Sequence, residues 1–380
     1  MASRPLQDAF KAHPITLHDK QFDFRSLREL PESFKWVQLD EDANVSSPAT
    51  PSSRGEVGDE PIPIIDLQGD NVLENIEKAC KTWGIFQVTN HGVPLSVLQD
   101  INETCQSLFQ LPNDRKLEAA RKPDGVTGYG VARISSFFSK LMWSEGFTIV
   151  GSPLEHFRRL WPQDFAKYCN MVQEYDQAMQ SLCGRVMWSM LAALGIDMDD
   201  VKWACPNLEP TEARAALQLN YYPACPDPDR AMGLAAHTDS TLFTILYQNN
   251  TTGLQVHKEG TRWVDVPPVP GCLIVNVGDL FHILSNGAYV TVFHRAVVNR
   301  TNYRISVAYL YGPPSNAEIS PLPQLVGPNQ PPLYRPITWK EYLGTKAKYF
   351  NEALLSVRTC APLNAGGSID VGDHSSIQVG

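Results

Sequence analysis

Apolar residues in the first half of the chain recur at helical spacing. In residues 71–83, Val72, Ile76 and Ala79 fall three or four positions apart, so that one face of a helix would carry them all. Gly84 follows this segment and is a typical residue for ending a helix. The same spacing predicts helices over two later segments, residues 94–111 and 165–194.

From residue 215 onward the pattern changes to short apolar runs separated by Gly, Pro and Asn, which is typical of strands. Strands are predicted over residues 216–222, 241–247, 253–257, 262–266, 272–277, 289–298 and 304–310, after two earlier ones over residues 62–67 and 85–89. Because many short strands with frequent turns favour a sandwich or barrel, we expect a jelly-roll or cupin-like core. The expected fold class is mixed α and β, with helices flanking that core and a helical N-terminal region.

Two segments carry few large apolar side chains. Residues 41–60 contain Ser, Pro, Thr and acidic residues, and residues 364–380 are rich in Gly and Ser, so both are predicted to be flexible. The expected organisation comprises an N-terminal extension with this linker, a mostly helical region, the β core, a C-terminal helical segment and a flexible tail. The corresponding boundaries are residues 1–60, 61–200, 201–315, 316–363 and 364–380.

Composition narrows the class of protein. The chain has 380 residues and a net charge of −9 without a basic run, so we expect no nucleic-acid partner. No apolar stretch reaches about 18 residues, the length that a membrane span requires, and no membrane association is expected. The 8 cysteines are scattered without a C-x-x-C pair, which favours free thiols in a reducing compartment. We expect a cytoplasmic monomer that acts on a small molecule.

A candidate metal site begins at His237 and Asp239. If both lie in a strand, residues two positions apart point to the same face and can reach one ion. His294, in a later predicted strand, would complete the set. Two histidines and one carboxylate leave three octahedral positions open, an arrangement that suits iron(II). Zinc also accepts these ligands and remains an alternative.

Arg304 and Ser306 form a second pair with the same spacing. A guanidinium can bind a carboxylate through two hydrogen bonds, and a hydroxyl can add a third. The pair therefore predicts an anion site beside the metal. The alternative is a surface charge on the strand.

These residues carry a family resemblance. Residues 220–225 (NYYPAC), 237–239 (HTD), 278–279 (GD), 294–295 (HR) and 304–306 (RIS) resemble, in order and spacing, the plant-type 2-oxoglutarate and iron(II)-dependent dioxygenases. Residues 61–67 and 83–94 resemble the companion N-terminal region of that family. The resemblance implies a distorted double-stranded β-helix that uses Fe(2+), 2-oxoglutarate and O2, with ascorbate keeping the iron reduced.

The resemblance also implies residue roles. It assigns His237, Asp239 and His294 as iron ligands. It assigns the distal carboxylate of 2-oxoglutarate to Arg304 and Ser306, and further contacts with the same molecule to Tyr222 and Asn220.

A closer resemblance concerns residues 128–130, 133–138, 141–148 and 234–256, which are similar to the gibberellin 3-beta-dioxygenases. It implies 3-beta-hydroxylation of a gibberellin precursor to a bioactive gibberellin, with release of succinate and CO2. A gibberellin is an apolar diterpenoid with a carboxylate, so its pocket should combine apolar walls with a cation.

The same segment supplies candidates for that pocket. We expect Arg133 to hold the carboxylate, with Lys140 as the next candidate, and Phe138 and Trp143 to line the pocket. The alternatives are a solvated loop cation and ordinary core aromatics.

Other functions stay open at this point. A related oxygenase could act on another gibberellin carbon or on a flavonoid. A second possibility is an oxidase that uses the same iron site without 2-oxoglutarate. A third, from another class, is a non-catalytic hormone-binding protein, although such a protein has no need of three metal ligands.

Overall fold

The computed structural model describes residues 23–36, 61–123, 125–204, 215–258, 263–314 and 316–359. The linker predicted over residues 41–60 and the tail predicted over residues 364–380 lie outside these ranges. Within them, no helix is long and apolar enough to cross a membrane.

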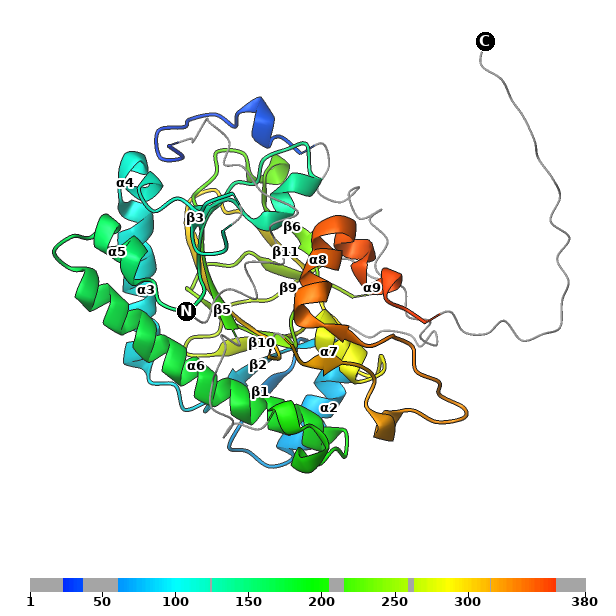
Figure 1. Ribbon diagram of the computed structural model, residues 1–380. Coiled ribbons are helices and arrows are strands. Elements are labelled where there is room, and N and C mark those ends of the chain that lie inside the picture. Colours follow the sequence, from blue (N-terminus) through cyan, green and yellow to red (C-terminus); the bar gives the residue numbers. More distant parts are fainter. Residues whose placement is uncertain are drawn as a thin grey trace, which may run out of the picture.

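Two β-sheets form the centre of the molecule (Figure 1). In spatial order, the larger sheet consists of β1 (Ile64–Asp66), β2 (Ile85–Thr89), β10 (Leu273–Val277), β7 (Phe243–Gln248), β12 (Arg304–Tyr311), β5 (Ala215–Tyr222), β4 (Glu145–Ile149) and β3 (Gly128–Gly130). The smaller sheet consists of β6 (Met232–His237), β11 (Phe293–Val297), β8 (Leu254–His257) and β9 (Trp263–Asp265). The predicted mixed α and β class with a jelly-roll core is confirmed.

The two sheets pack against each other through apolar side chains. Leu246 of β7 and Ile274 of β10 share a buried cluster with Leu254 and Val256 of β8. Because side chains alternate along each strand, the inner faces supply both this packing and the walls of an internal cavity.

Helices cover the outer face of the larger sheet (Figure 1). They include α2 (Val72–Thr82), α3 (Leu95–Gln110), α4 (Asn113–Leu117), α5 (Leu154–Leu160) and the long α6 (Phe165–Ala193). In α6, Val172, Tyr175, Met179, Leu182 and Val186 are buried at spacings of three and four, so this helix presents one apolar stripe to the core. The predicted helices and strands of the N-terminal half are confirmed to within a few residues.

Strands β3, β4 and β6 and the short helix α7 (Asp279–Leu284) were not predicted. β3 reads GYG and β6 reads MGLAAH, and such small residues have low strand preference. Pairing with neighbours decides their structure, since β3 pairs with β4 and β6 pairs with β11. Because β4 also pairs with β5, the regions before and after residue 200 share one sheet.

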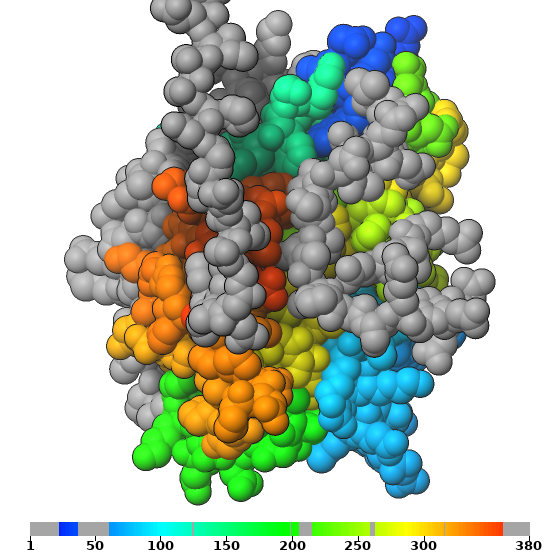
Figure 2. All heavy atoms as spheres, turned by 90° about the vertical axis from the view of Figure 1, so that its right-hand side faces the viewer, coloured from blue at the N-terminus to red at the C-terminus, as the bar shows by residue number. Residues whose placement is uncertain are grey.

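The C-terminal segment lies beside the smaller sheet (Figure 1). It contains β13 (Glu318–Ile319), β14 (Ile337–Thr338), α8 (Trp339–Tyr349), the 3-10 turn η8 (Phe350–Glu352) and α9 (Ala353–Ser356). The hydroxyl of Thr338 accepts a hydrogen bond from the backbone of Glu341 and caps α8. Figure 2 shows this segment in orange and red on the face of the molecule below the teal residues of the N-terminal half.

Candidate functional site

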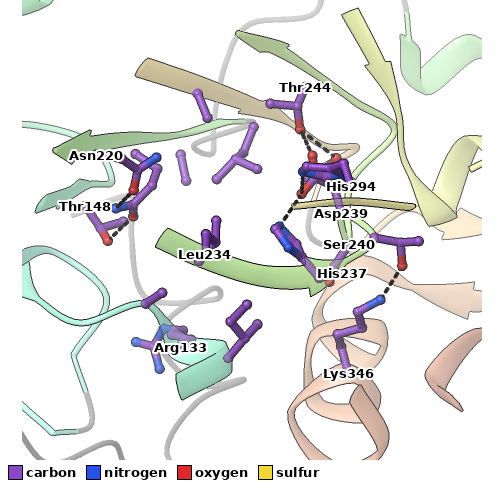
Figure 3. A pocket seen from close by; sticks show the side chains of 18 of the residues that line it. Arg133, Thr148, Asn220, Leu234, His237, Asp239, Ser240, Thr244, His294 and Lys346 are labelled. Atoms are coloured by element: carbon purple, nitrogen blue, oxygen red, sulfur yellow. Dashed lines mark hydrogen bonds and ion pairs between the residues drawn. The ribbon is translucent and has the colours of Figure 1, made fainter. Parts of the chain in front are cut away.

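A cavity of about 580 Å³ opens between the two sheets and is closed on one side by α8. Residues of β5, β6, β7, β11 and β12 line it, together with η3 (Arg133–Phe137) and α8. Figure 3 shows His237, Asp239 and His294 gathered at one end, with Arg133 across the cavity.

The three predicted metal ligands lie together. His237 ends β6 and lies opposite His294 of β11 in register. Asp239 Oδ1 is 3.6 Å from His237 Nε2 and 3.9 Å from His294 Nε2, and all three ligand atoms lie within 4.8 Å of one another. The strand-face argument for Asp239 was wrong, because β6 ends at His237 and Asp239 lies in the loop that follows.

Hydrogen bonds leave one ligand atom available on each side chain. Nδ1 of His237 lies 2.8 Å from the carbonyl oxygen of Ala235, and Nδ1 of His294 lies 3.2 Å from that of Val292. Each Nδ1 therefore carries the proton and donates, which leaves Nε2 with a lone pair. Asp239 accepts the hydroxyl of Thr244 at Oδ2 (2.6 Å), so that Oδ1 faces the two histidines.

Electrostatics set the protonation that a metal requires. Burial and the neighbouring His237 together lower the pKa of His294 to about 4. Burial opposes ionisation of Asp239, but His294, His237 and Thr244 outweigh it and hold the pKa of this carboxyl well below its usual range. At neutral pH the site presents a neutral imidazole at His294 beside an ionised carboxylate. Two nitrogens and one oxygen on one side of a cavity fit iron(II) with open positions, and they also fit zinc.

The predicted anion site lies on the adjacent strands. Arg304 is the register partner of Tyr222, and Ser306 is the register partner of Asn220. The side chains are in contact, because Asn220 Nδ2 lies 3.5 Å from Ser306 Oγ and the guanidinium of Arg304 lies 5.1 Å from the centre of the Tyr222 ring. All four residues line the cavity.

Arg304 is a buried cation with neutral partners. Its side chain donates to Gln248 Oε1 from Nη2 at 2.9 Å and from Nε at 3.3 Å, and its exposed fraction is 2%. Burial lowers the pKa of Arg304, with Tyr222 acting in the opposite direction. Among the described residues no carboxylate forms an ion pair with it, and an unpaired buried charge is costly. An anionic ligand would supply the opposite charge that Arg304 lacks, so the site favours the binding of an anion.

The predicted substrate residues divide into two groups. Arg133 lines the cavity and donates from Nη2 to the carbonyl oxygen of Gly125. Phe138, Lys140 and Trp143 do not line it. Trp143 is fully buried, and its indole donates to the carbonyl oxygen of Pro223.

These positions correct the predicted roles of the last three residues. Trp143 packs against Phe24 and Phe34, so it is a core residue beneath the N-terminal segment. Lys140 Nζ donates to the carbonyl oxygen of Glu32 at 3.1 Å, which turns it toward that same segment. Phe138 packs edge-on against Phe350, one layer behind the cavity wall.

Phe137, which comes from the same segment as Arg133, lines the cavity and stacks on Phe350, with ring centroids 4.7 Å apart. Sequence reasoning missed other lining residues. Arg121 also lines the cavity; it donates to Val131 O at 2.5 Å and to Thr148 Oγ1 at 3.4 Å. Lys346 reaches the same cavity from α8. No local spacing marks these residues, because each comes from a segment far from the metal motif in sequence.

Comparisons with known proteins agree with this geometry. Residues 213–313 match the family model of the 2OG-Fe(II) oxygenase superfamily, and residues 62–164 match that of the non-haem dioxygenase in morphine synthesis N-terminal region. Among solved structures, JOX2 in complex with 2OG, Fe and JA is similar, with a TM-score of 0.73, 33% identity, and coverage of 88% of this chain and 95% of that chain. The dioxygenase for auxin oxidation in rice has a TM-score of 0.65 and 26% identity, and the match covers 79% of this chain and 100% of that one.

Curated relatives are more similar still. Gibberellin 3-beta-dioxygenase 1 of Pisum sativum is 56% identical over 99% of this chain and 99% of its own length. Gibberellin 3-beta-dioxygenase 1 of Arabidopsis thaliana is 57% identical over 93% of this chain and 98% of its own length. The resemblance that the motifs predicted is confirmed, and the chain belongs to the 2OG-Fe(II) oxygenase superfamily and, within it, to the gibberellin 3-beta-dioxygenase family.

Proposed function

We propose that the protein hydroxylates a gibberellin precursor at the 3-beta position to give a bioactive gibberellin, with release of succinate and CO2. One observation carries the chemistry: three available ligand atoms and a buried guanidinium with neutral partners face the same cavity. The similarity over nearly the whole chain to gibberellin 3-beta-dioxygenases supports the choice of substrate.

Iron(II) would be held by Nε2 of His237, Oδ1 of Asp239 and Nε2 of His294. When bound, iron and 2-oxoglutarate supply the oxidising chemistry, in which O2 oxidises both the 2-oxo acid and an unactivated C–H bond of the substrate. Ascorbate would keep the iron reduced. The protein's own part is to fix the ligands, and the bonds from Nδ1 of each histidine to the backbone orient both rings.

Arg304 and Ser306 would hold the distal carboxylate of 2-oxoglutarate. The guanidinium offers two parallel donors, and Ser306 Oγ lies two residues away on the same face of β12. Gln248, which now accepts from Arg304, would keep the fork oriented. Tyr222 and Asn220 complete the wall through their register with this pair.

The gibberellin carboxylate would lie against Arg133 and Arg121. Burial and, to a smaller extent, the neighbouring charge of Arg121 together lower the pKa of Arg133 to about 9. Two cations that disfavour each other's charge gain from a carboxylate placed between them. Apolar side chains would cover the diterpenoid skeleton, and the candidates among the lining residues are Ile134, Phe137, Leu234 and Phe350.

The charge of the cavity agrees with two acidic ligands. Its lining has one carboxylate, that of Asp239, and five cationic side chains: Arg121, Arg133, Arg295, Arg304 and Lys346. The chain as a whole has a net charge of −9, so the cavity is a local exception. A cationic cleft in an acidic protein concentrates anionic substrates.

Product analysis tests the proposal. Purified protein is incubated with iron(II), ascorbate, 2-oxoglutarate and a panel of gibberellin precursors, and products are identified by mass spectrometry. The expected result is a 3-beta-hydroxylated gibberellin with one succinate per product. Oxidation at another carbon, or of a flavonoid alone, would overturn the substrate. Turnover without 2-oxoglutarate, or tight binding without turnover, would overturn the reaction.

We also propose that the enzyme is a cytoplasmic monomer. The cysteines among the described residues are free thiols, as expected in a reducing compartment. All candidate ligands come from one chain, so that catalysis needs no second copy. Light scattering of the purified protein and imaging of a fluorescent fusion test the two statements separately.

A further inference from the structure

The end of β6 and the loop after it carry two candidate ligands and are held from behind by the C-terminal segment. We call residues 236–240, which comprise the last two residues of β6 and the start of that loop, the ligand loop, and residues 339–351 the clasp. Three hydrogen bonds join them: Asn351 Nδ2 to Ala236 O at 3.4 Å, Lys346 Nζ to Thr238 Oγ1 at 2.5 Å, and Trp339 Nε1 to Ser240 O at 2.7 Å. The contacted residues alternate along the loop with His237 and Asp239, which face the metal position. The clasp therefore holds the side of the loop that faces away from the metal.

Asp279 joins the loop to the clasp. Its carboxylate is fully buried, and Oδ2 accepts hydrogen bonds from Thr238 Oγ1 at 3.0 Å, Tyr342 Oη at 2.7 Å and Lys346 Nζ at 2.9 Å. Its backbone N–H also donates to the backbone carbonyl of Asp239 at 2.9 Å. These bonds hold the ligand loop both at the side chain of Thr238 and at the backbone of Asp239.

The same carboxylate reaches the strand of the third ligand. Oδ1 of Asp279 accepts the hydroxyl of Thr291 at 2.8 Å, three residues before His294. One buried acid thus connects the ligand loop, the approach to β11 and the clasp. A displacement of Asp279 would move the ligands relative to one another.

An ion pair stabilises the contact between Asp279 and the clasp. Lys346 is 8% exposed and forms an ion pair with Asp279, so each buried charge has its partner. Thr238 bridges the two, because its hydroxyl donates to the acid and accepts from the ammonium. Replacing this hydroxyl by a methyl group leaves the ion pair in place and removes the bond to the ligand loop.

The clasp also lines the cavity. Its cavity-lining residues follow helical spacing: Trp339, Leu343, Lys346, Ala347 and Phe350. One face of α8 therefore contacts the cavity while Lys346 and Trp339 hold the loop. A substrate in the cavity would press on the element that positions the metal ligands.

We infer that Thr238, Asp279 and Lys346 are positioning residues that align His237 and Asp239 for iron, through the clasp. The inference rests on the proposed iron ligands and not on the choice of gibberellin. The candidate ligand set is His237, Asp239 and His294, and none of the three positioning residues belongs to it. Partners of this kind behind metal ligands typically change metal affinity by 10–100-fold.

The test is an anaerobic calorimetric titration of the metal-free full chain with iron(II). Thr238→Val is expected to weaken iron binding by about tenfold or more, and Thr238→Ser, which keeps the hydroxyl, should stay within about threefold of the native protein. Tyr342→Phe removes one bond to Asp279 and should give a smaller loss in the same direction. A second readout, succinate released per hydroxylated product, should rise in Thr238→Val, because misaligned ligands uncouple the two oxidations.

Tyr309→Phe is the matched control. Its hydroxyl also donates to a buried acid, Asp176, at 2.9 Å, but it has no contact with the ligand loop. It should lose thermal stability and keep native iron affinity. Native affinity in both Thr238→Val and Tyr342→Phe would overturn the inference, as would an equal loss in Tyr309→Phe. If Thr238→Val does not fold, Tyr342→Phe alone decides.

Asp239→Ala separates this inference from the assignment on which it rests. Loss of iron binding in Asp239→Ala with native binding in both Thr238→Val and Tyr342→Phe refutes the clasp and leaves the ligand assignment intact. Native binding in Asp239→Ala refutes both.

Discussion

His237 and His294 lie directly opposite each other across the β6–β11 pair, with ring centroids 4.3 Å apart. The pairing brings together two strands that lie far apart in the chain. Asp239 then reaches both rings from the loop after β6. Strand pairing therefore supplies two ligands of the site, and the loop supplies the third.

Loss of any one ligand should abolish turnover. In His294→Ala the carboxylate and one imidazole remain, which is too few to hold iron against water. We expect no detectable hydroxylation and loss of bound iron, with far-UV circular dichroism unchanged. His156→Gln removes a half-buried histidine that packs against Phe147 away from the cavity, and it should keep full activity. Full activity in His294→Ala with iron present would contradict the assignment.

Substitutions in the co-substrate site should change the KM for 2-oxoglutarate and leave the KM for the gibberellin nearly unchanged. Arg304→Lys keeps the charge and loses the two-pronged geometry, so its KM for 2-oxoglutarate should rise while the KM for the gibberellin changes little. Arg304→Ala should cost about 2–5 kcal/mol of 2-oxoglutarate binding. Arg335→Ala, which breaks a surface ion pair with Glu341, is the control. The role is refuted if half-saturation is unchanged in Arg304→Ala.

Gly253 is expected to matter because it lies against Arg304. A Cβ at Gly253 would lie 2.9 Å from Arg304 Cδ and 2.7 Å from the carbonyl oxygen of Val297, and its φ of +154° is rarely adopted by residues with side chains. Gly253→Ala should therefore displace the guanidinium and raise the KM for 2-oxoglutarate, with some loss of stability. Gly327→Ala is the matched control, since its Cβ would meet nothing within 4 Å. Similar kinetics in both variants would contradict this account.

His282 predicts a dependence of stability on pH. Its Nδ1 faces the carbonyl oxygen of Tyr289 at 2.6 Å, its Nε2 faces the hydroxyl of Tyr334 at 2.8 Å, and burial lowers its pKa below the usual 6.5. As pH falls below 6.5 the unfolded chain takes up this proton before the folded chain does, so the free energy of unfolding decreases. Above pH 6.5 both states are neutral and the contribution is constant.

Urea unfolding at several pH values between 5 and 7.5 measures this effect. In His282→Gln the free energy of unfolding should fall less steeply below pH 6.5, by up to about 1.4 kcal/mol per pH unit. Identical slopes in native protein and variant would show that His282 does not titrate differently in the two states.

The ligand and anion motifs could be predicted from sequence because each depends on short spacing. Arg304 and Ser306 alternate along one strand, and β12 has the strong apolar pattern that identifies it. Asp239 was identified from spacing as well, although its strand ends two residues earlier. In that case the motif was more informative than the local structure assigned to it.

The substrate wall could not be predicted in the same way. Arg133 and Lys140 lie seven residues apart in one segment, and sequence does not tell which of them faces the cavity. The contacts that orient these side chains come from the N-terminal segment, which is distant in sequence. Lys140 donates a hydrogen bond to Glu32, and Trp143 is covered by Phe24 and Phe34. The contacts of the clasp could not be predicted for the same reason, because Lys346 lies 108 positions from Thr238 in sequence.

The last prediction concerns the two arginines proposed to hold the gibberellin carboxylate. Arg133→Ala and Arg121→Gln should each raise the KM for the free acid about tenfold or more, the usual cost of losing a hydrogen bond to a charged group. Succinate formation without gibberellin should stay near the native rate, because neither residue contacts the co-substrate wall. Arg158→Gln, which breaks an exposed pair with Glu155, should leave all parameters unchanged.

A gibberellin methyl ester completes the test by removing the charge from the ligand and not from the protein. The ester should be a poor substrate of the native enzyme, since it offers no negative charge to the guanidinium groups of Arg121 and Arg133. The ester cannot form the ion pair, so replacing Arg133 or Arg121 should change its KM little. The KM values of native and variant enzymes should therefore differ far less with the ester than with the acid. That double difference isolates the carboxylate interaction from any general disturbance of the cavity, which would slow both ligands equally. If Arg133→Ala and Arg121→Gln both oxidise the free acid as well as the native enzyme does, the anchor lies elsewhere in the cavity.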